Sequence, residues 1–185
     1  MQSRARVEAR VLTRRGMFWI AAGDSCHYTS DVIKGRPPRL PEIFQSIGQP
    51  LFFVTMCTLH RTKFTSLTVV QECLRQYAHR GTTEFNVAIG RYVVMPDHLH
   101  LFVRGDDNFV LASWVKGLKR TISERLTSAD KSFRWQPGFF DHVLRNNESY
   151  GQKWNYVRDN PVRAGLVERS EDWPYQGEIV YIDRA

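Results

Sequence analysis

Positions 92–103 of this 185-residue chain read Tyr92-Val93-Val94-Met95-Pro96-Asp97-His98-Leu99-His100-Leu101-Phe102-Val103. Two β-prone segments, about 85–95 and 98–104, are joined there by the turn-forming pair Pro96-Asp97, and this pattern predicts a β-hairpin. Successive side chains of a strand point to opposite faces, so His98 and His100 share one face while the leucines beside them occupy the other. The hairpin therefore carries two histidines into the middle of a predicted sheet.

The segments around this hairpin alternate between strand and helix patterns. A β-prone run occupies 51–58, and a helix capped by Ser66 follows, with apolar residues at one-face spacing until Gly81. Beyond the hairpin, Asn108 is expected to cap a second amphipathic helix. The buried stripe of that helix consists of Leu111, Trp114, Val115, Leu118 and Ile122.

The segment after Pro137-Gly138 supplies the last elements. Residues 139–144 have a strand pattern, and Asn147 opens a third helix that we expect to end at Asn160, because Pro161 follows. The order β-α-β-β-α-β followed by a helix predicts an α+β fold, the ferredoxin-like split βαβ sandwich. Its antiparallel sheet would carry helices on one face and leave the other face available for a ligand or another helix.

The composition is that of a basic globular protein. Hydrophobic residues make up 42% and aromatic residues 12%, and the formal net charge of +7 suits a polyanionic partner. We predict a basic arm over 1–35, one domain over 36–175 and a tail over 176–185. Positive charge is concentrated in residues 1–15 and again between 116 and 134.

The cysteines and the hydropathy indicate the cellular compartment in which we expect the protein. Cys26, Cys57 and Cys73 are widely spaced and form no CxxC pair, which favours a reduced cytoplasmic protein without a zinc cluster. No apolar run approaches the roughly 20 residues of a membrane span. We therefore expect a soluble cytoplasmic protein, associated with the nucleoid if its partner is DNA.

Two constellations can carry chemistry. His98 and His100 lie about 7 Å apart along one strand face, and neutral imidazoles at that spacing can bind one metal ion. On the third helix, Tyr150, Trp154 and Val157 form a core stripe at i, i+4 and i+7. Gln152, Tyr156 and Asn160 lie on a more polar face, where Tyr156 and Asn160 can present a phenol and an amide oxygen to the same spot.

Four stretches resemble single-tyrosine transposases of the REP-associated branch. Residues 95–103 are similar to their HUH motif (histidine, bulky hydrophobic residue, histidine), and residues 156–167 to their tyrosine helix. Residues 53–58 resemble the first strand of that branch and 114–119 its second helix. The resemblance runs from about residue 36 to 173, in the same order and spacing.

The resemblance implies an HUH endonuclease fold in which the tyrosine helix faces the sheet. Tyr156 would be the nucleophile, and His98, His100 and Asn160 would hold Mg²⁺ or Mn²⁺. Insertion-sequence relatives commonly have glutamine as the third ligand, and Asn160 keeps the amide on a shorter arm. The implied reaction cleaves and rejoins single-stranded DNA at hairpins of repetitive extragenic palindromes through a 5′-phosphotyrosine. The acting species would be a monomer or a homodimer.

Charge adds candidates for DNA contact. Binding of single strands combines a basic groove with aromatic stacking. Tyrosine has a pKa near 10 and needs assistance to ionise; the sequence offers no clear general base, and the metal itself, Lys119 or Lys116 could help. The residues that we expect to contact phosphates are Arg104, Lys116, Lys119, Arg120, Arg158 and Arg163.

Three alternatives share parts of this pattern. A relaxase or replication initiator has the paired histidines but usually places its tyrosine before them, whereas Tyr156 follows them. A hairpin-binding regulator derived from a transposase would have no reason to keep both histidines and Tyr156. A metal-dependent hydrolase with a bound water would need a carboxylate, and Asp97 is expected to point to the opposite face of the strand.

Overall fold

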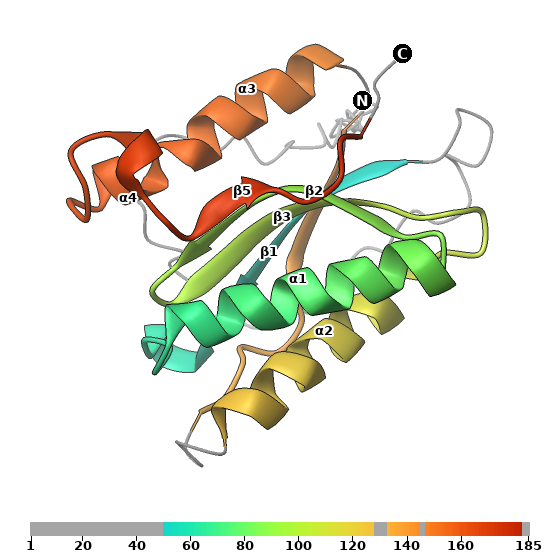
Figure 1. Cartoon of the computed structure of the whole chain (residues 1–185), viewed down its shortest axis with the longest axis horizontal. Helices are drawn as coiled ribbons and strands as arrows, with labels where there is room; N and C mark the ends of the chain where they lie inside the picture. Colours follow the sequence, from blue (N-terminus) through green and yellow to red (C-terminus); the bar gives the residue numbers. More distant parts are fainter. Residues whose placement is uncertain (1–49, 128–132, 145–146, 183–185) are drawn as a thin grey trace, which may run out of the picture. The chain divides into compact units, whose positions relative to one another are not determined.

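The computed structural model describes residues 50–127, 133–144 and 147–182 (Figure 1). The first six elements are the strands and helices of the predicted split βαβ order. They are β1 (Leu51–Cys57), α1 (Leu67–Glu84), β2 (Ala88–Met95), β3 (His98–Arg104), α2 (Leu111–Leu126) and β4 (Phe140–Leu144). Three more follow, α3 (Asn147–Arg158), α4 (Asn160–Arg163) and β5 (Gln176–Glu178), and short 3₁₀ turns lie at Leu59–Arg61 and Ser170–Asp172.

The sheet has the strand order β4-β1-β3-β2-β5, and every neighbouring pair is antiparallel. Its first four positions are those of a ferredoxin-like sheet, so the predicted α+β fold is confirmed. The predicted hairpin is confirmed as well, with Met95 paired to His98 across the Pro96-Asp97 turn. The histidine strand β3 is therefore central, between β1 and β2.

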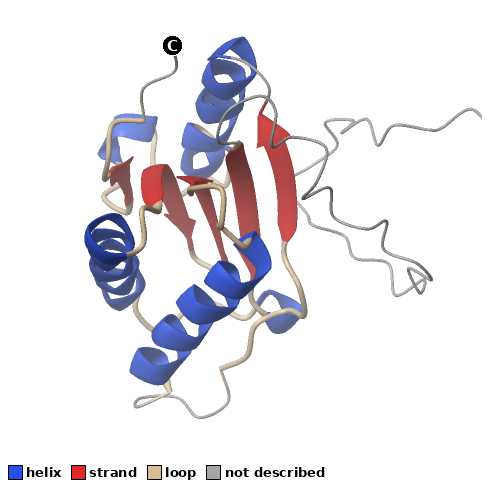
Figure 2. Cartoon of the chain, turned by 90° about the vertical axis from the view of Figure 1, so that its right-hand side faces the viewer, coloured by secondary structure: helices blue, strands red, loops and turns tan. Residues whose placement is uncertain are grey.

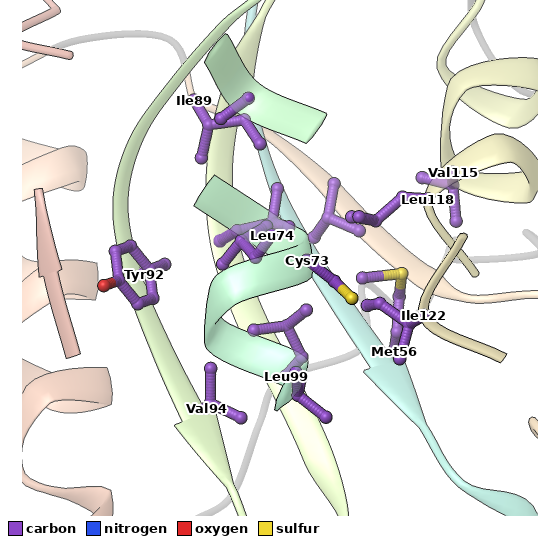
Figure 3. Packing of buried hydrophobic residues seen from close by; sticks show 14 of the residues in the cluster. Met56, Cys73, Leu74, Ile89, Tyr92, Val94, Leu99, Val115, Leu118 and Ile122 are labelled. Atoms are coloured by element: carbon purple, nitrogen blue, oxygen red, sulfur yellow. The ribbon is translucent and has the colours of Figure 1, made fainter. Parts of the chain in front are cut away.

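Helices α1 and α2 cover one face of the sheet, below it in Figure 1, and α3 lies above the other face. Figure 2 shows the same strands from the side, with helices on both flanks. Leu99, Leu101 and Val103 of β3 pack with α1 and α2 in the main core, part of which is drawn in Figure 3. The alternation that buries these residues places His98, His100 and Phe102 on the α3 face.

Helix α3 is held on that face by aromatic contacts. The ring of Phe102 is fully buried and lies 4.4 Å from the ring of Tyr150 and 6.4 Å from that of Trp154, centroid to centroid. Val157 packs with Val93 in the same layer. Of the predicted core stripe, Tyr150 and Val157 are thus buried and Trp154 is partly buried, and the docking of this stripe determines where Tyr156 lies.

Helix boundaries differ from the predictions at several points. Ser66 caps α1 as expected, accepting a hydrogen bond from the Val69 amide at 3.3 Å, but the helix continues three residues past Gly81. Asn108 does not cap α2, which begins at Leu111 after the N-cap Val110. The Asn108 amide instead donates to the Asp106 carboxylate, because a local Asx turn competes with capping.

Pro161 acts differently from our expectation. Helix α3 ends at Arg158, two residues before the predicted end, and Pro161 lies in the first turn of the separate helix α4. Proline is tolerated there because its missing N–H would have no helical partner in a first turn. The break at Asp159 separates Asn160 from the helix that carries Tyr156.

We predicted an unpaired tail over 176–185, and this prediction is wrong for residues 176–182, which the structure describes. Gln176–Glu178 forms the edge strand β5 against β2, and Ile182 is buried. Gly90 lies at a bulge in β2, and a Cβ there would approach the Ile182 Cδ1 atom to 2.9 Å. A three-residue strand is too short to produce a periodic sequence signal.

Two of the predicted basic segments cannot be compared with the structure. The basic arm at 1–35 and the middle of the second basic cluster, at 128–132, lie outside the described residues. Within the described part of the chain, no helix combines the length and the apolar character needed to cross a bilayer.

The first testable prediction concerns the docking of α3. Phe102→Ala removes a fully buried ring that touches both Tyr150 and Trp154. We expect the free energy of unfolding to fall by about 3–5 kcal/mol, measured by urea denaturation. Phe140 is 42% exposed on β4, so Phe140→Ala is the matched control and should change the value by less than about 0.5 kcal/mol. Equal losses in the two variants would contradict this account of the core.

Candidate metal and nucleophile site

The two histidines of β3 form a compact pair. Their ring centroids lie 4.7 Å apart and their planes are nearly perpendicular, at 84°. His98 is buried and His100 is partly buried, so neither is an ordinary surface histidine. The prediction that they share one face of the strand is confirmed by the strand register and by this contact.

Each ring uses its Nδ1 atom for a contact within the protein. Nδ1 of His98 lies 2.6 Å from the Asp97 carboxylate, and Nδ1 of His100 lies 2.8 Å from the Thr55 hydroxyl on β1. A hydrogen bond at one ring nitrogen fixes the ring orientation and makes the other nitrogen the ligating atom. Both histidines are therefore prepared to ligate through Nε2.

Asp97 corrects a prediction. We expected its carboxylate on the far face of a strand, but Asp97 lies in the hairpin turn and contacts the ring that follows it. The alternation rule fails there because turn residues do not have strand geometry. Burial raises the pKa of Asp97, but the hydrogen bond to His98 and the charges of His98 and Arg61 outweigh it, so the pKa lies below its usual value.

The loop after β1 holds this turn in place. Arg61 forms an ion pair with the Asp97 carboxylate, with Nε 2.8 Å from Oδ2. Thr58 donates to the Asp97 carbonyl from both its amide and its hydroxyl, each at 3.0 Å. His60 and Arg61 have positive φ angles of 53° and 57°, a conformation that is uncommon outside glycine and costs energy. The ion pair between Arg61 and Asp97 is therefore formed by a loop whose backbone is locally strained.

His100 is kept neutral by its surroundings. Burial lowers the pKa of His100 well below its ordinary value, and the positive charges of His98, Arg61, Lys153 and Arg163 lower it further. The Phe53 ring stacks on it, 5.5 Å away and 16° from parallel. A neutral imidazole has a free electron pair, which is the form that binds a metal ion.

Asn160 lies beside this pair. Its side chain is 5% exposed, and Nδ2 is 3.0 Å from Nε2 of His100. Arg163 donates to the Asn160 Oδ1 atom and, at 2.7 Å, to the carbonyl of Tyr156. The shorter arm of asparagine therefore still reaches His100, because the helix break at Asp159 lets α4 approach the sheet.

Tyr156 is connected to the same group through Arg163. The guanidinium carbon lies 4.2 Å from the centre of the Tyr156 ring, and the tyrosine is 43% exposed. The tyrosine lines an open cavity of about 230 Å³ with residues of β4 and α3, namely His142, Leu144, Gln152 and Lys153. The structure thus places the nucleophile candidate at an accessible surface near a buried polar site.

The remaining candidates fall on both sides of the sheet. Helix α2 lies on the face opposite the histidines and carries Lys116, Lys119 and Arg120. The prediction that Lys116 or Lys119 assists the ionisation of Tyr156 is therefore wrong. The Lys119 ammonium donates to the carbonyls of Gln136 and Gly138, and burial lowers its pKa to about 8.

The three other arginines lie toward the histidine face. Arg163 borders Tyr156 and Asn160, as described above. Arg158 forms an ion pair with Glu171 at 3.3 Å, and Arg104 ends the histidine strand. Of the six predicted phosphate contacts, the structure therefore brings three to the side of the candidate site.

Sequence reasoning missed several residues of the site. Thr55 and Arg61 are distant in sequence from the histidines, so no pattern indicated them. Asp97 was considered, but its contact with His98 was missed because turn residues follow no strand alternation. Lys153 is different, because it precedes Tyr156 by three residues on one helix and should lie on a neighbouring position of its surface.

The donor set fits a divalent cation that has two imidazole ligands and one amide ligand. Among the described residues, no group of three histidine, cysteine or acidic side chains gathers anywhere, so a third protein ligand here would come from the Asn160 amide. In this structure the amide nitrogen faces His100 and the oxygen accepts from Arg163, so the side chain would have to turn over to offer its oxygen to a cation. Metal sites in proteins commonly combine imidazole nitrogens with neutral oxygens, and the ring nitrogen that does not bind the metal is hydrogen-bonded to a neighbouring group.

Comparison with known proteins identifies the family. The family model described as "Transposase IS200 like" matches residues 51–160. A REP-associated tyrosine transposase of Escherichia coli K12 is 32% identical over 132 residues, 69% of this chain and 75% of that protein. A Haemophilus influenzae relative is 29% identical over 143 residues, which are 68% of this chain and 77% of that protein.

A solved structure agrees with the sequence relatives. It shows a REP-associated tyrosine transposase bound to a REP hairpin, and it superimposes with a TM-score of 0.58 at 26% identity, over 69% of this chain and 75% of that one. The fold, the order of the histidines and the tyrosine, and these matches lead to one assignment. The chain belongs to the IS200-like family of single-tyrosine transposases.

Proposed function

We propose that this protein cuts and rejoins single-stranded DNA beside hairpins of repetitive extragenic palindromes, with Tyr156 as the nucleophile. The observation that carries the proposal is the histidine pair, whose Nδ1 atoms are held by Asp97 and Thr55, with the Asn160 amide nitrogen 3.0 Å from Nε2 of His100. Such an arrangement prepares two imidazoles and an amide for a cation next to an accessible tyrosine. The relative solved with a REP hairpin supports the choice of DNA.

The covalent step transfers a phosphate to the tyrosine. The Tyr156 oxygen attacks phosphorus, a new O–P bond forms, and the bond between phosphorus and the 3′ oxygen breaks. The phenol releases its proton to solvent, and the departing 3′ oxygen takes one from solvent. Because the phosphodiester energy is kept in the tyrosine ester, the returning attack of a 3′-hydroxyl rejoins a strand without ATP.

His98, His100 and Asn160 would hold Mg²⁺ or Mn²⁺. A bound divalent cation would supply Lewis-acid polarisation of a non-bridging phosphate oxygen. Two imidazole ligands suit Mn²⁺ better than Mg²⁺, which prefers oxygen donors and its own waters. We therefore expect Mn²⁺ to bind the protein more tightly than Mg²⁺.

The positions of the basic residues indicate how the strand lies. Arg163 borders the Tyr156 ring, so we assign it to a phosphate next to the cleaved bond. Arg158 is ion-paired with Glu171 and lines a different cavity, so its contact with DNA stays a prediction for another part of the strand. Lys116, Lys119 and Arg120 lie on the opposite face and are not assigned to that part of the strand. Contacts of this kind position the DNA without reading its sequence.

The test uses the whole protein and a labelled hairpin with a single-stranded flank. With Mn²⁺ or Mg²⁺ we expect a covalent protein–DNA species on denaturing gels, and none with EDTA. Cleavage without a covalent species would indicate water as the nucleophile and contradict the proposal. Tight hairpin binding without cleavage in either metal would support the regulator instead.

A second prediction concerns the carboxylate that orients His98. Asp97→Ala removes the 2.6 Å contact with the ring, so Mn²⁺ affinity should fall about 10–100-fold. Calorimetric titration of the DNA-free protein with Mn²⁺ measures this directly. Asp107 is exposed in the loop after β3, and Asp107→Ala, which removes the same charge, should leave the affinity unchanged. An unchanged affinity in Asp97→Ala would show that this contact does not prepare the site.

A further inference from the structure

Lys153 occupies a special position beside the nucleophile. It precedes Tyr156 by three residues on α3, and both line the cavity of about 230 Å³. Its ammonium lies 5.2 Å from the centre of the Phe53 ring, and Phe53 in turn stacks on His100. Lys153 therefore borders the same cavity as the tyrosine and is linked to His100 through the Phe53 ring.

The charges around this cavity are unbalanced. Lys153 is partly buried, and within the described parts of the chain no carboxylate lies within 4.0 Å of its ammonium. The other titratable groups that face the phenol are Arg163 of α4 and His142 of β4. Burial lowers the pKa of the Lys153 ammonium. A partly buried cation without an acidic partner is stabilised when an anion enters the cavity.

We propose that Lys153 is a further catalytic residue, whose ammonium contacts the phosphate attacked by Tyr156 and stabilises the negative charge that develops during the transfer. This inference rests on the proposed function. Lys153 keeps its proton throughout, while the O–P bond to tyrosine forms and the bond to the 3′ oxygen breaks. A fixed cation aimed at developing charge is among the strongest catalytic devices that a protein has.

The surrounding contacts explain why the lysine is available for this role. The Phe53 ring holds the ammonium by a cation–π contact that does not use up its three N–H donors. Lys119, by contrast, donates to the two carbonyls of Gln136 and Gly138 on the other face of the sheet. Of these two lysines, the one on the tyrosine side of the sheet is therefore Lys153, on the same helix as Tyr156.

The experiment compares Lys153→Met and Lys153→Gln with Lys153→Arg, and uses Arg75→Met, at an exposed position of α1, as a matched loss of charge. Single-turnover formation of the covalent species is measured at saturating hairpin DNA with Mn²⁺, and hairpin affinity is measured separately by fluorescence anisotropy. For both uncharged variants we expect the rate to fall about 10²–10³-fold. Their affinity should change less than about tenfold, because one phosphate contact among several is lost.

Lys153→Arg should recover part of the rate, and Arg75→Met should react as the unaltered protein does. Melting temperatures within about 2 °C show that the variants are folded, and two uncharged side chains protect the test against a packing defect in either. An unchanged rate in Lys153→Met and Lys153→Gln overturns the inference, and so does a loss of hairpin affinity as large as the loss of rate. Failure of the unaltered protein to form any covalent species would instead overturn the proposed function.

Discussion

Tyr156→Phe is expected to lower the rate of covalent protein–DNA formation by about 10⁴-fold or more, because it removes the only atom of that side chain that can attack phosphorus. The substitution keeps the ring, so the cation–π contact with Arg163 at 4.2 Å is retained. The side chain is 43% exposed, and loss of its hydroxyl should therefore cost little stability. Hairpin affinity and melting temperature should stay as they are.

A matched control separates the nucleophile from any tyrosine near DNA. Tyr181 is 74% exposed and lies beyond β5, outside the site, so Tyr181→Phe should react at the normal rate. The rate is measured in a single turnover with labelled strand and Mn²⁺. Persistent strand cleavage in Tyr156→Phe would mean that water, or another side chain, attacks the phosphate.

His100→Ala is expected to lower Mn²⁺ affinity by more than about 100-fold and to abolish cleavage. Loss of a partner outside the ligand set already costs about 10–100-fold, and loss of a ligand costs more. His100 is held in a ligating orientation by Thr55 and by the stacked Phe53 ring. The stabilisation that saturating Mn²⁺ gives by linkage should disappear with it.

The readout for His100→Ala is the rise in Tm on adding Mn²⁺, together with calorimetric affinity. We expect a clear rise in the unaltered protein and none in the variant. His79 is exposed on α1, on the other side of the sheet, and His79→Ala should behave as the unaltered protein. A normal Mn²⁺ response in His100→Ala would remove this histidine from the ligand set.

The fold was largely predictable because its signals are local. The alternation in β3 and the Pro96-Asp97 turn predicted the hairpin, and helical spacing predicted α1 and α2. The errors occur where a local contact outcompetes a rule, as when Asn108 forms an Asx turn instead of a cap. The short edge strand β5 was missed because three residues carry no period, and its position depends on pairing with β2.

The candidate site was predictable only in part. The histidine spacing on β3 and the polar face of the tyrosine helix could be predicted, because each depends on a short stretch of sequence. The partners that prepare the site could not, because Thr55 and Arg61 reach the histidines from β1 and the loop after it. Lys153 shows an intermediate case, since helical spacing could have found it but only the cavity shows that it faces Tyr156.

The most direct test of the central claim is mass spectrometry of the covalent species after digestion with nuclease and trypsin. Trypsin cleaves after Lys153 and after Arg158, so residues 154–158 form a peptide that contains one tyrosine. We predict that this peptide carries the mass of a 5′-linked nucleotide, on Tyr156. A nucleotide on any other peptide, or strand cleavage that leaves every peptide unmodified, would contradict the account.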